Sequence, residues 1–146
     1  MPGNELLRLL QDREVLLEAH AASSAYVMRR AFEGIKELKA FRGRTDLAPA
    51  ILARLQSLSK EPRDPVMLGA HLYALELTGS HLEIGKGVSL LLEKRPIFQD
   101  PLLGQFAGSV GATLARMTEK LVPGTVFQAK DLEAILKALK GKGGPS

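Results

Sequence analysis

Apolar residues recur at helical spacing along most of the chain, and no stretch shows the sustained two-residue alternation of a strand. One apolar stripe runs through residues 4–42 almost without drift. Its members are Leu10, Leu17, Ala21, Met28, Phe32 and Ile35. We therefore expect a long N-terminal helix, capped by Asn4 and reaching almost to Arg42. Glu14 interrupts the stripe and Asp12 can cap a new helix, so a break near residues 11–13 stays open.

Gly43 then ends this region, because glycine is a common helix terminator. Thr45 or Asp46 is expected to cap the next helix, with Pro49 inside its first turn. The apolar positions of that helix are Leu47, Ile51, Leu55 and Leu58.

The most apolar segment of the chain follows a loop over residues 60–65 and begins at Asp64-Pro65, a typical helix start. Residues 66–77 are apolar around nearly the whole helix circumference, so this helix should be buried. Gly79 closes it. The run Ser80-His81-Leu82-Glu83 is a capping box that opens another helix, and the short connection makes the two helices antiparallel neighbours.

Residues 100–121 predict a buried, glycine-rich fifth helix. Its apolar stripe consists of Leu103, Phe106, Ala107, Val110, Leu114, Met117 and Leu121. A neighbouring face holds Gly104, Gly108, Gly111 and Ala115, and small residues let another helix approach closely. Only Gln105, Ser109, Arg116, Glu119 and Lys120 remain for water. We expect this helix to be central, with neighbours on two sides.

The sequence predicts one more helix near the C-terminus, opened by the capping box at residues 125–128 and carrying Leu132, Ile135, Leu136 and Leu139. Residues 141–146 form a flexible tail. About six helices joined by short loops predict a compact all-α, single-domain bundle over residues 4–140.

Composition restricts the chemistry that the chain can perform. Its 146 residues contain no cysteine, which excludes disulfides, thiolate zinc sites and cysteine nucleophiles. Neither a signal peptide nor a membrane span is visible, so a cytoplasmic location is expected.

The net charge of +4 is concentrated between residues 36 and 63. Three acidic residues lie there against seven basic ones, namely Lys36, Lys39, Arg42, Arg44, Arg54, Lys60 and Arg63. A local excess of this kind favours nucleic-acid backbone or an acidic protein as a partner. A basic surface that is simply solvated explains it equally well. Phe41 is the one aromatic residue among these cations, so backbone contact is favoured over base stacking.

Catalytic patterns are weak. His20, His71 and His81 have no partner spaced to share a helix face, and Gly85-Lys86-Gly87 fails the spacing of a phosphate-binding loop. A helix-turn-helix through residues 121–125 is disfavoured, because Asp131 and Glu133 would face phosphates. We expect no catalytic residue, no cofactor and no metal site.

The sequence therefore predicts a non-catalytic helical binding module, an accessory subunit of a larger assembly with a basic face. Its partner is a protein or a second copy, with nucleic-acid backbone as a further possibility and no role for a membrane. One alternative is a structural or oligomerising helical protein without a nucleic-acid role. The third is an enzyme with a histidine site that converges across helices.

Overall fold

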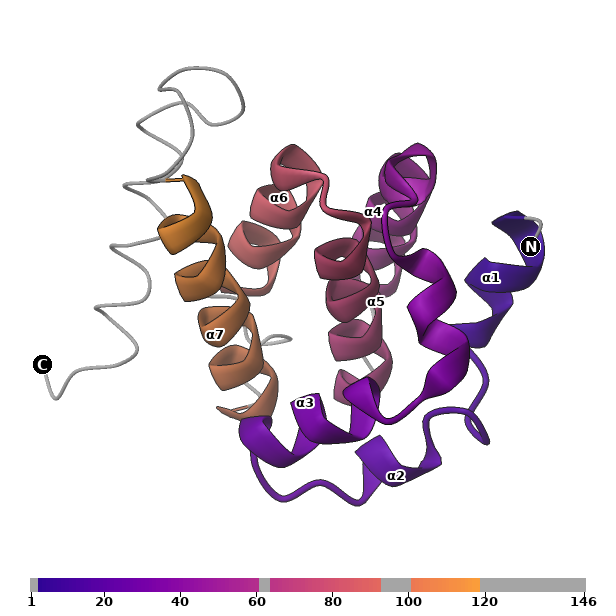
Figure 1. The fold of residues 1–146 in the computed structure, drawn as a ribbon. Coiled ribbons are helices and arrows are strands. Elements are labelled where there is room, and N and C mark those ends of the chain that lie inside the picture. Colours follow the sequence, from indigo (N-terminus) through magenta and orange to yellow (C-terminus); the bar gives the residue numbers. More distant parts are fainter. Residues whose placement is uncertain (1–2, 61–63, 93–100, 119–146) are drawn as a thin grey trace, which may run out of the picture.

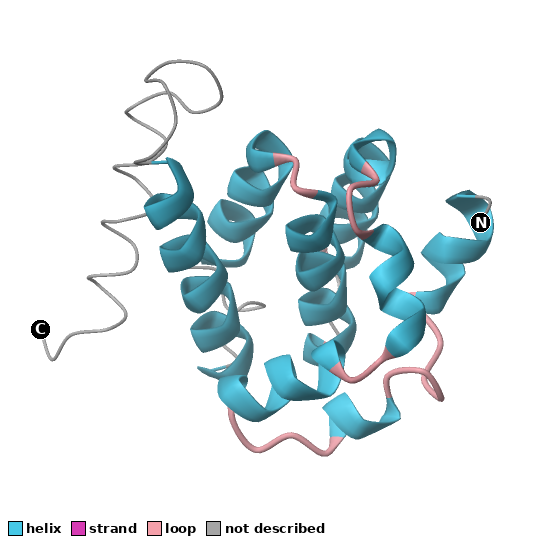
Figure 2. Ribbon diagram, in the orientation of Figure 1, coloured by secondary structure: helices cyan, strands magenta, loops and turns pink. Residues whose placement is uncertain are grey.

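A computed structural model describes residues 3–60, 64–92 and 101–118, and every regular element within these ranges is a helix (Figures 1 and 2). The predicted all-α fold is confirmed. The predicted capping box at residues 125–128, the helix through Leu139 and the tail 141–146 lie outside the described residues. No helix in the described ranges has the length and apolar character needed to cross a membrane.

The prediction of one long N-terminal helix is wrong. Residues 3–41 form four short helices: α1 (Gly3–Leu9), α2 (Leu17–His20), α3 (Ala25–Glu33) and the 3₁₀ helix η1 (Lys36–Phe41). Asn4 lies inside α1 rather than capping it. Four members of the apolar stripe are buried, namely Leu10, Met28, Phe32 and Ile35. The register shifts around α2, where Leu17 and Ala21 are exposed and Leu16 and Ala19 are buried instead.

Local polar groups interrupt this N-terminal stretch. Asp12 accepts hydrogen bonds from the backbone N–H groups of Glu14 (2.9 Å) and Val15 (3.3 Å), near the break that the sequence left open. Ser24 caps α3 by accepting from the Val27 N–H. Gly34 follows the last residue of α3. Side-chain caps of this kind satisfy donors that a continuous helix would otherwise use, so short helices replace a long one.

Past Gly43, the 3₁₀ turn η2 (Thr45–Leu47) leads into α4 (Ala48–Leu58), with Pro49 in the first turn as predicted. The predicted cap is wrong. Leu47 occupies the cap position without a side-chain hydrogen bond, and the Asp46 carboxylate instead binds Arg44.

Helix α5 (Pro65–Thr78) matches its prediction closely. Asp64 Oδ1 accepts from the N–H groups of Val66 (3.0 Å) and Met67 (3.2 Å), and Gly79 ends the helix with a left-handed φ of 77°. Helix α6 (His81–Leu92) follows, with two residues between it and the end of α5. At its start the Ser80 hydroxyl donates to Glu83 (2.7 Å), while the Ser80 N–H donates to Thr78 rather than to Glu83.

Helices α4, α5, α6 and α7 (Pro101–Thr118) form an antiparallel bundle, and α3 crosses beneath the ends of α5 and α7 (Figure 1). Helix α5 is surrounded by α3, α4, α6, α7 and η1. It is buried from Leu68 to Leu75 because no arc of its circumference is left for water.

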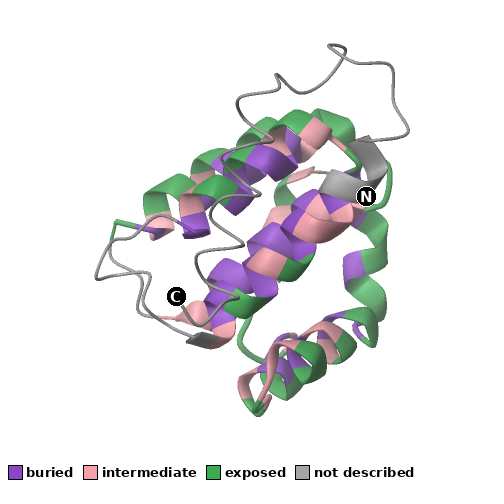
Figure 3. Cartoon of the chain, turned by 90° about the vertical axis from the view of Figure 1, so that its left-hand side faces the viewer, coloured by how far each residue is buried: buried purple, intermediate pink, exposed green. Residues whose placement is uncertain are grey.

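The glycine-rich helix is α7, which packs against α3, α5 and α6. Its stripe Leu103, Phe106, Ala107, Val110 and Leu114 is buried. Between residues 102 and 114 only Gln105 and Ser109 are exposed, as predicted. Figure 3 views the bundle from the side of α7 and shows this helix mostly in the colours of buried and intermediate residues. The central position expected for this helix belongs to α5 in the described part of the chain.

Candidate functional site

The 3₁₀ helix η1 sorts its side chains by a three-residue period, because residues three apart eclipse one another in this helix type. Ile35, Leu38 and Phe41 recur at this interval and all three are buried. The other residues of η1 therefore lie on two further edges of the helix. The sequence contains this signal as three apolar residues at intervals of three. An α-helix also places apolar residues three apart, so the interval alone does not identify a 3₁₀ helix.

Lys36 and Lys39 share one exposed edge of η1, and Arg42 continues the same three-residue step. The Arg42 N–H donates to the Lys39 carbonyl (3.1 Å), which keeps Arg42 in register. We call these three residues the basic ridge. Within the described ranges, no carboxylate forms an ion pair with any of them. At about 2.0 Å per residue, successive cations of the ridge are about 6 Å apart along the axis.

Packing and a hydrogen bond fix the position of the basic ridge relative to the core. Leu38 and Phe41 anchor η1 in the core, and the Gly43 N–H donates to the Leu77 carbonyl near the end of α5 (3.0 Å). Gly43 has a φ of 74°, a left-handed conformation that favours glycine. The turn after the ridge is thereby attached to the most buried helix of the fold.

The other predicted basic residues do not extend this ridge. Arg44 binds Asp46 through two parallel contacts of 3.0 Å, and this pairing raises the pKa of Arg44 and lowers that of Asp46. Arg54 is half-buried on α4, where its charge acts on His71. Lys60 is exposed at the far end of α4, a helix about 16 Å long. Arg63 lies outside the described residues.

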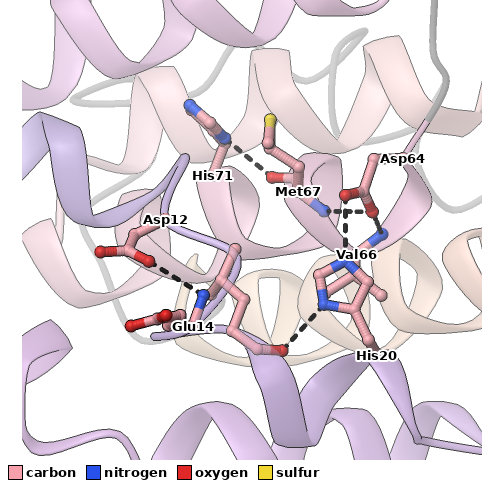
Figure 4. Close-up of polar contacts among 8 residues, drawn as sticks. Asp12, Glu14, His20, Asp64, Val66, Met67 and His71 are labelled. Carbon is pink, nitrogen blue, oxygen red and sulfur yellow. Dashed lines mark hydrogen bonds and ion pairs between the residues drawn. The ribbon is translucent and has the colours of Figure 1, made fainter.

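The side chains of His20 and Asp64 form a contact that local spacing could not reveal, since 44 residues separate them. His20 Nε2 lies 3.0 Å from Asp64 Oδ2, and His20 Nδ1 lies 3.0 Å from the Leu16 carbonyl oxygen (Figure 4). Burial by itself raises the pKa of Asp64, but hydrogen bonds from His20 and the backbone N–H groups hold it below 3.8. The pair joins α2 to the start of α5.

This arrangement is unsuited to general-base catalysis. A general base needs a ring nitrogen that faces the substrate. Both nitrogens of His20 instead face protein oxygens, the Leu16 carbonyl and the Asp64 carboxylate. Among the described residues, no group of three or more His, Cys, Asp or Glu side chains is arranged to hold a metal ion.

His71 is fully buried on α5 and makes one hydrogen bond. Its Nδ1 donates to the Met67 carbonyl (2.7 Å), while Nε2 has no partner within the described part of the chain (Figure 4). Burial, with a smaller contribution from the charge of Arg54, lowers the pKa of His71 from 6.5 to about 4. His71 is therefore neutral near pH 7.

A third polar cluster joins α3, α5 and α7. Arg29 binds Glu76 through two contacts of 2.9 and 3.2 Å, and its guanidinium lies 5.4 Å from the centre of the Phe106 ring. Phe32 packs edge-on against the same ring. These contacts bridge three helices and give Arg29 a structural role.

An open groove of about 450 Å³ lies between residues 12–18 and the junction of α3 with η1. We call it the acidic groove. It is lined by Asp12, Glu14, Val15, Leu17, Glu18, Gly34, Ile35 and Glu37. The four carboxylates have no ion-pair partner among the residues that the structure describes. Leu17 is 66% exposed at this groove.

Comparison of the chain with protein-family models, with curated proteins and with solved structures finds no significant match.

Proposed function

We propose that this protein is a non-catalytic helical binding module, an accessory subunit whose basic ridge binds the phosphate backbone of a nucleic acid. The observation that carries the proposal is the row formed by Lys36, Lys39 and Arg42, three exposed cations without an ion-pair partner among the described residues. Cations of this kind gain affinity for a polyanion by releasing its condensed counterions.

The surroundings of the ridge favour contact with the backbone over recognition of bases. Phe41 is fully buried, so it cannot stack on a base. Lysine and arginine contacts to phosphates position a protein on nucleic acid and carry little sequence information. We therefore expect weak binding without strong sequence preference, as one component of a larger assembly.

The occupied ring nitrogens of His20 support the non-catalytic part of the proposal. The Arg44–Asp46 ion pair argues against Arg44 as part of the contact surface, since Asp46 places a negative charge beside it. The ridge, rather than all seven predicted basic residues, is therefore the proposed contact.

The test is a titration of the full chain with labelled single-stranded and duplex DNA and RNA at low salt. Changing Lys36, Lys39 and Arg42 together to Gln should weaken binding at least about tenfold, because each charged contact contributes roughly 1 kcal/mol or more. The matched control changes Lys60, Lys86 and Arg30 to Gln, three exposed cations outside the ridge. This control should retain most of the affinity.

A parallel titration with polyglutamate separates the two classes of polyanion. Tighter binding to polyglutamate than to any nucleic acid would indicate that the partner of the ridge is an acidic protein. Equal loss in the ridge variant and its control would show that net charge, rather than the ridge, governs binding. Absence of binding to every polyanion would overturn the proposal.

A further inference from the structure

The basic ridge and the acidic groove occupy neighbouring sides of the same 3₁₀ helix. Lys36 and Lys39 share one edge of η1, and Glu37 lies one residue further around, about 120° away, where it lines the groove. The third edge is buried by Leu38 and Phe41. Two surfaces of opposite charge thus meet at one short helix, and neither forms an ion pair within the described residues.

We propose that the acidic groove binds the basic ridge of a second copy of this chain, so that the protein forms a two-fold symmetric dimer around η1. Charge complementarity selects this occupant. The groove has four carboxylates without an ion-pair partner among the described residues, and the ridge has three exposed cations at regular spacing.

The groove also fits the stems of long basic side chains. Val15 and Leu17 also line the groove, and both are accessible apolar side chains. Lysine and arginine pack their methylene groups on such surface while the charged end remains near acidic groups. Contact with a second copy would also cover the exposed side chain of Leu17.

Symmetry follows from the adjacency of the two surfaces. In a two-fold dimer, residue i of one copy contacts residue j of the other, and the reverse contact forms simultaneously. Because the ridge and the groove flank one helix, an axis near η1 places each ridge against the opposite groove. Each dimer therefore contains two copies of the same ridge-to-groove contact.

This inference does not depend on nucleic-acid binding, but it uses the same ridge. A nucleic acid and a second copy then compete for Lys36, Lys39 and Arg42, so each should weaken the binding of the other. The dimer should also be sensitive to salt, since the Debye length falls from about 30 Å at 0.01 M to about 3 Å at 1 M.

A charge exchange between two variants tests the dimer. The ridge-reversed variant carries Lys36→Glu and Lys39→Glu, and the groove-reversed variant carries Glu14→Lys and Glu18→Lys. Each variant alone faces like charge and should self-associate at least about tenfold more weakly than the unchanged chain. Mixed together, the two variants should form a heterodimer, because both of its contacts regain opposite charges.

Sedimentation equilibrium of each variant and of the mixture, at low and high salt, provides the readout. Circular dichroism verifies that the variants fold. Lys60→Glu with Lys86→Glu is the control, since it matches the charge change of the ridge-reversed variant away from η1. It should self-associate like the unchanged chain.

Three results would overturn the dimer: an unchanged chain that stays monomeric at low salt, self-association that persists in both variants, or a mixture that gives no heterodimer. The titration of the unchanged chain and of the Lys36, Lys39 and Arg42 to Gln variant with nucleic acid tests the proposed function separately. Loss of binding in that variant, with no dimer in the unchanged chain, would leave the proposed function intact and reject the dimer alone.

Discussion

At the scale of single residues, His71 is the group that most directly links burial to acid stability. Its pKa in the folded protein is about 4, below its ordinary 6.5, because burial disfavours the charged ring. Between these two values the unfolded chain binds more protons than the folded one. The stabilisation is therefore complete above pH 6.5 and is lost as the pH falls toward 4.

We expect His71 to account for about 3 kcal/mol of the decrease in unfolding free energy between pH 6.5 and 4, at about 1.4 kcal/mol per pKa unit. His71→Leu, which replaces the ring by an apolar side chain, should remove this share of the pH dependence. Urea unfolding at several pH values measures it. Parallel pH profiles for the two proteins would contradict the assignment.

Asp64 combines two roles, and two substitutions separate them. Its Oδ1 caps α5, and its Oδ2 binds His20. Asp64→Ala removes both contacts and should lower the unfolding free energy by at least about 1 kcal/mol. Asp64→Asn keeps an oxygen for the cap and should cost less. Chemical denaturation at pH 7 compares them, and equal costs would show that the cap contributes nothing.

At the scale of elements, glycine in α6 allows close approach to the bundle core. A Cβ atom at Gly87 would lie 3.0 Å from a methyl group of Leu75 and 3.1 Å from one of Leu72. Gly87→Leu should therefore lower the unfolding free energy by about 1–3 kcal/mol, because overpacking displaces neighbouring side chains.

The control for this change is Gly34→Leu. At exposed Gly34 a Cβ atom would meet only backbone oxygens at 3.5 and 3.6 Å. This variant should unfold close to the temperature of the unchanged chain. Similar decreases in melting temperature for both variants would argue against a tight contact at Gly87.

Helices whose start and stop residues are distinctive could be predicted from the sequence. The division of one apolar stripe into several short helices could not. Helix α5 has a start at Asp64-Pro65, an apolar interior and a stop at Gly79, so its limits were predictable. In the sequence, the apolar spacing continues across Asp12 and Ser24, so periodicity alone could not distinguish four helices from one. Ser24 was an available signal for the start of a new helix, because serine is a common N-cap residue.

The candidate site was predictable only in part. A surplus of positive charge between residues 36 and 63 is visible in the sequence, but its arrangement is not. The pairing of Arg44 with Asp46 and the alignment of Lys36 with Lys39 depend on the turn type. The contact of His20 with Asp64 needs the tertiary fold, because it joins residues far apart in the chain.

At the scale of the whole molecule, η1 determines how the protein presents its charge. A 3₁₀ helix with one buried edge separates the basic ridge from the acidic groove, although Lys36 and Glu37 are neighbours in the sequence. The bundle of α4 to α7 holds this helix in place through α5. Binding of a polyanion by the ridge is the central claim that follows from this arrangement.

The most direct measurement of this claim is the slope of log affinity against log salt concentration for a nucleic acid. Each phosphate contact contributes roughly 0.7–0.9 to the magnitude of the slope, so replacing Lys36, Lys39 and Arg42 by Gln should reduce it by about 2–3. The Lys60, Lys86 and Arg30 control should reduce it by less than about 1. A slope that is the same for the unchanged chain and the ridge variant would contradict the claim.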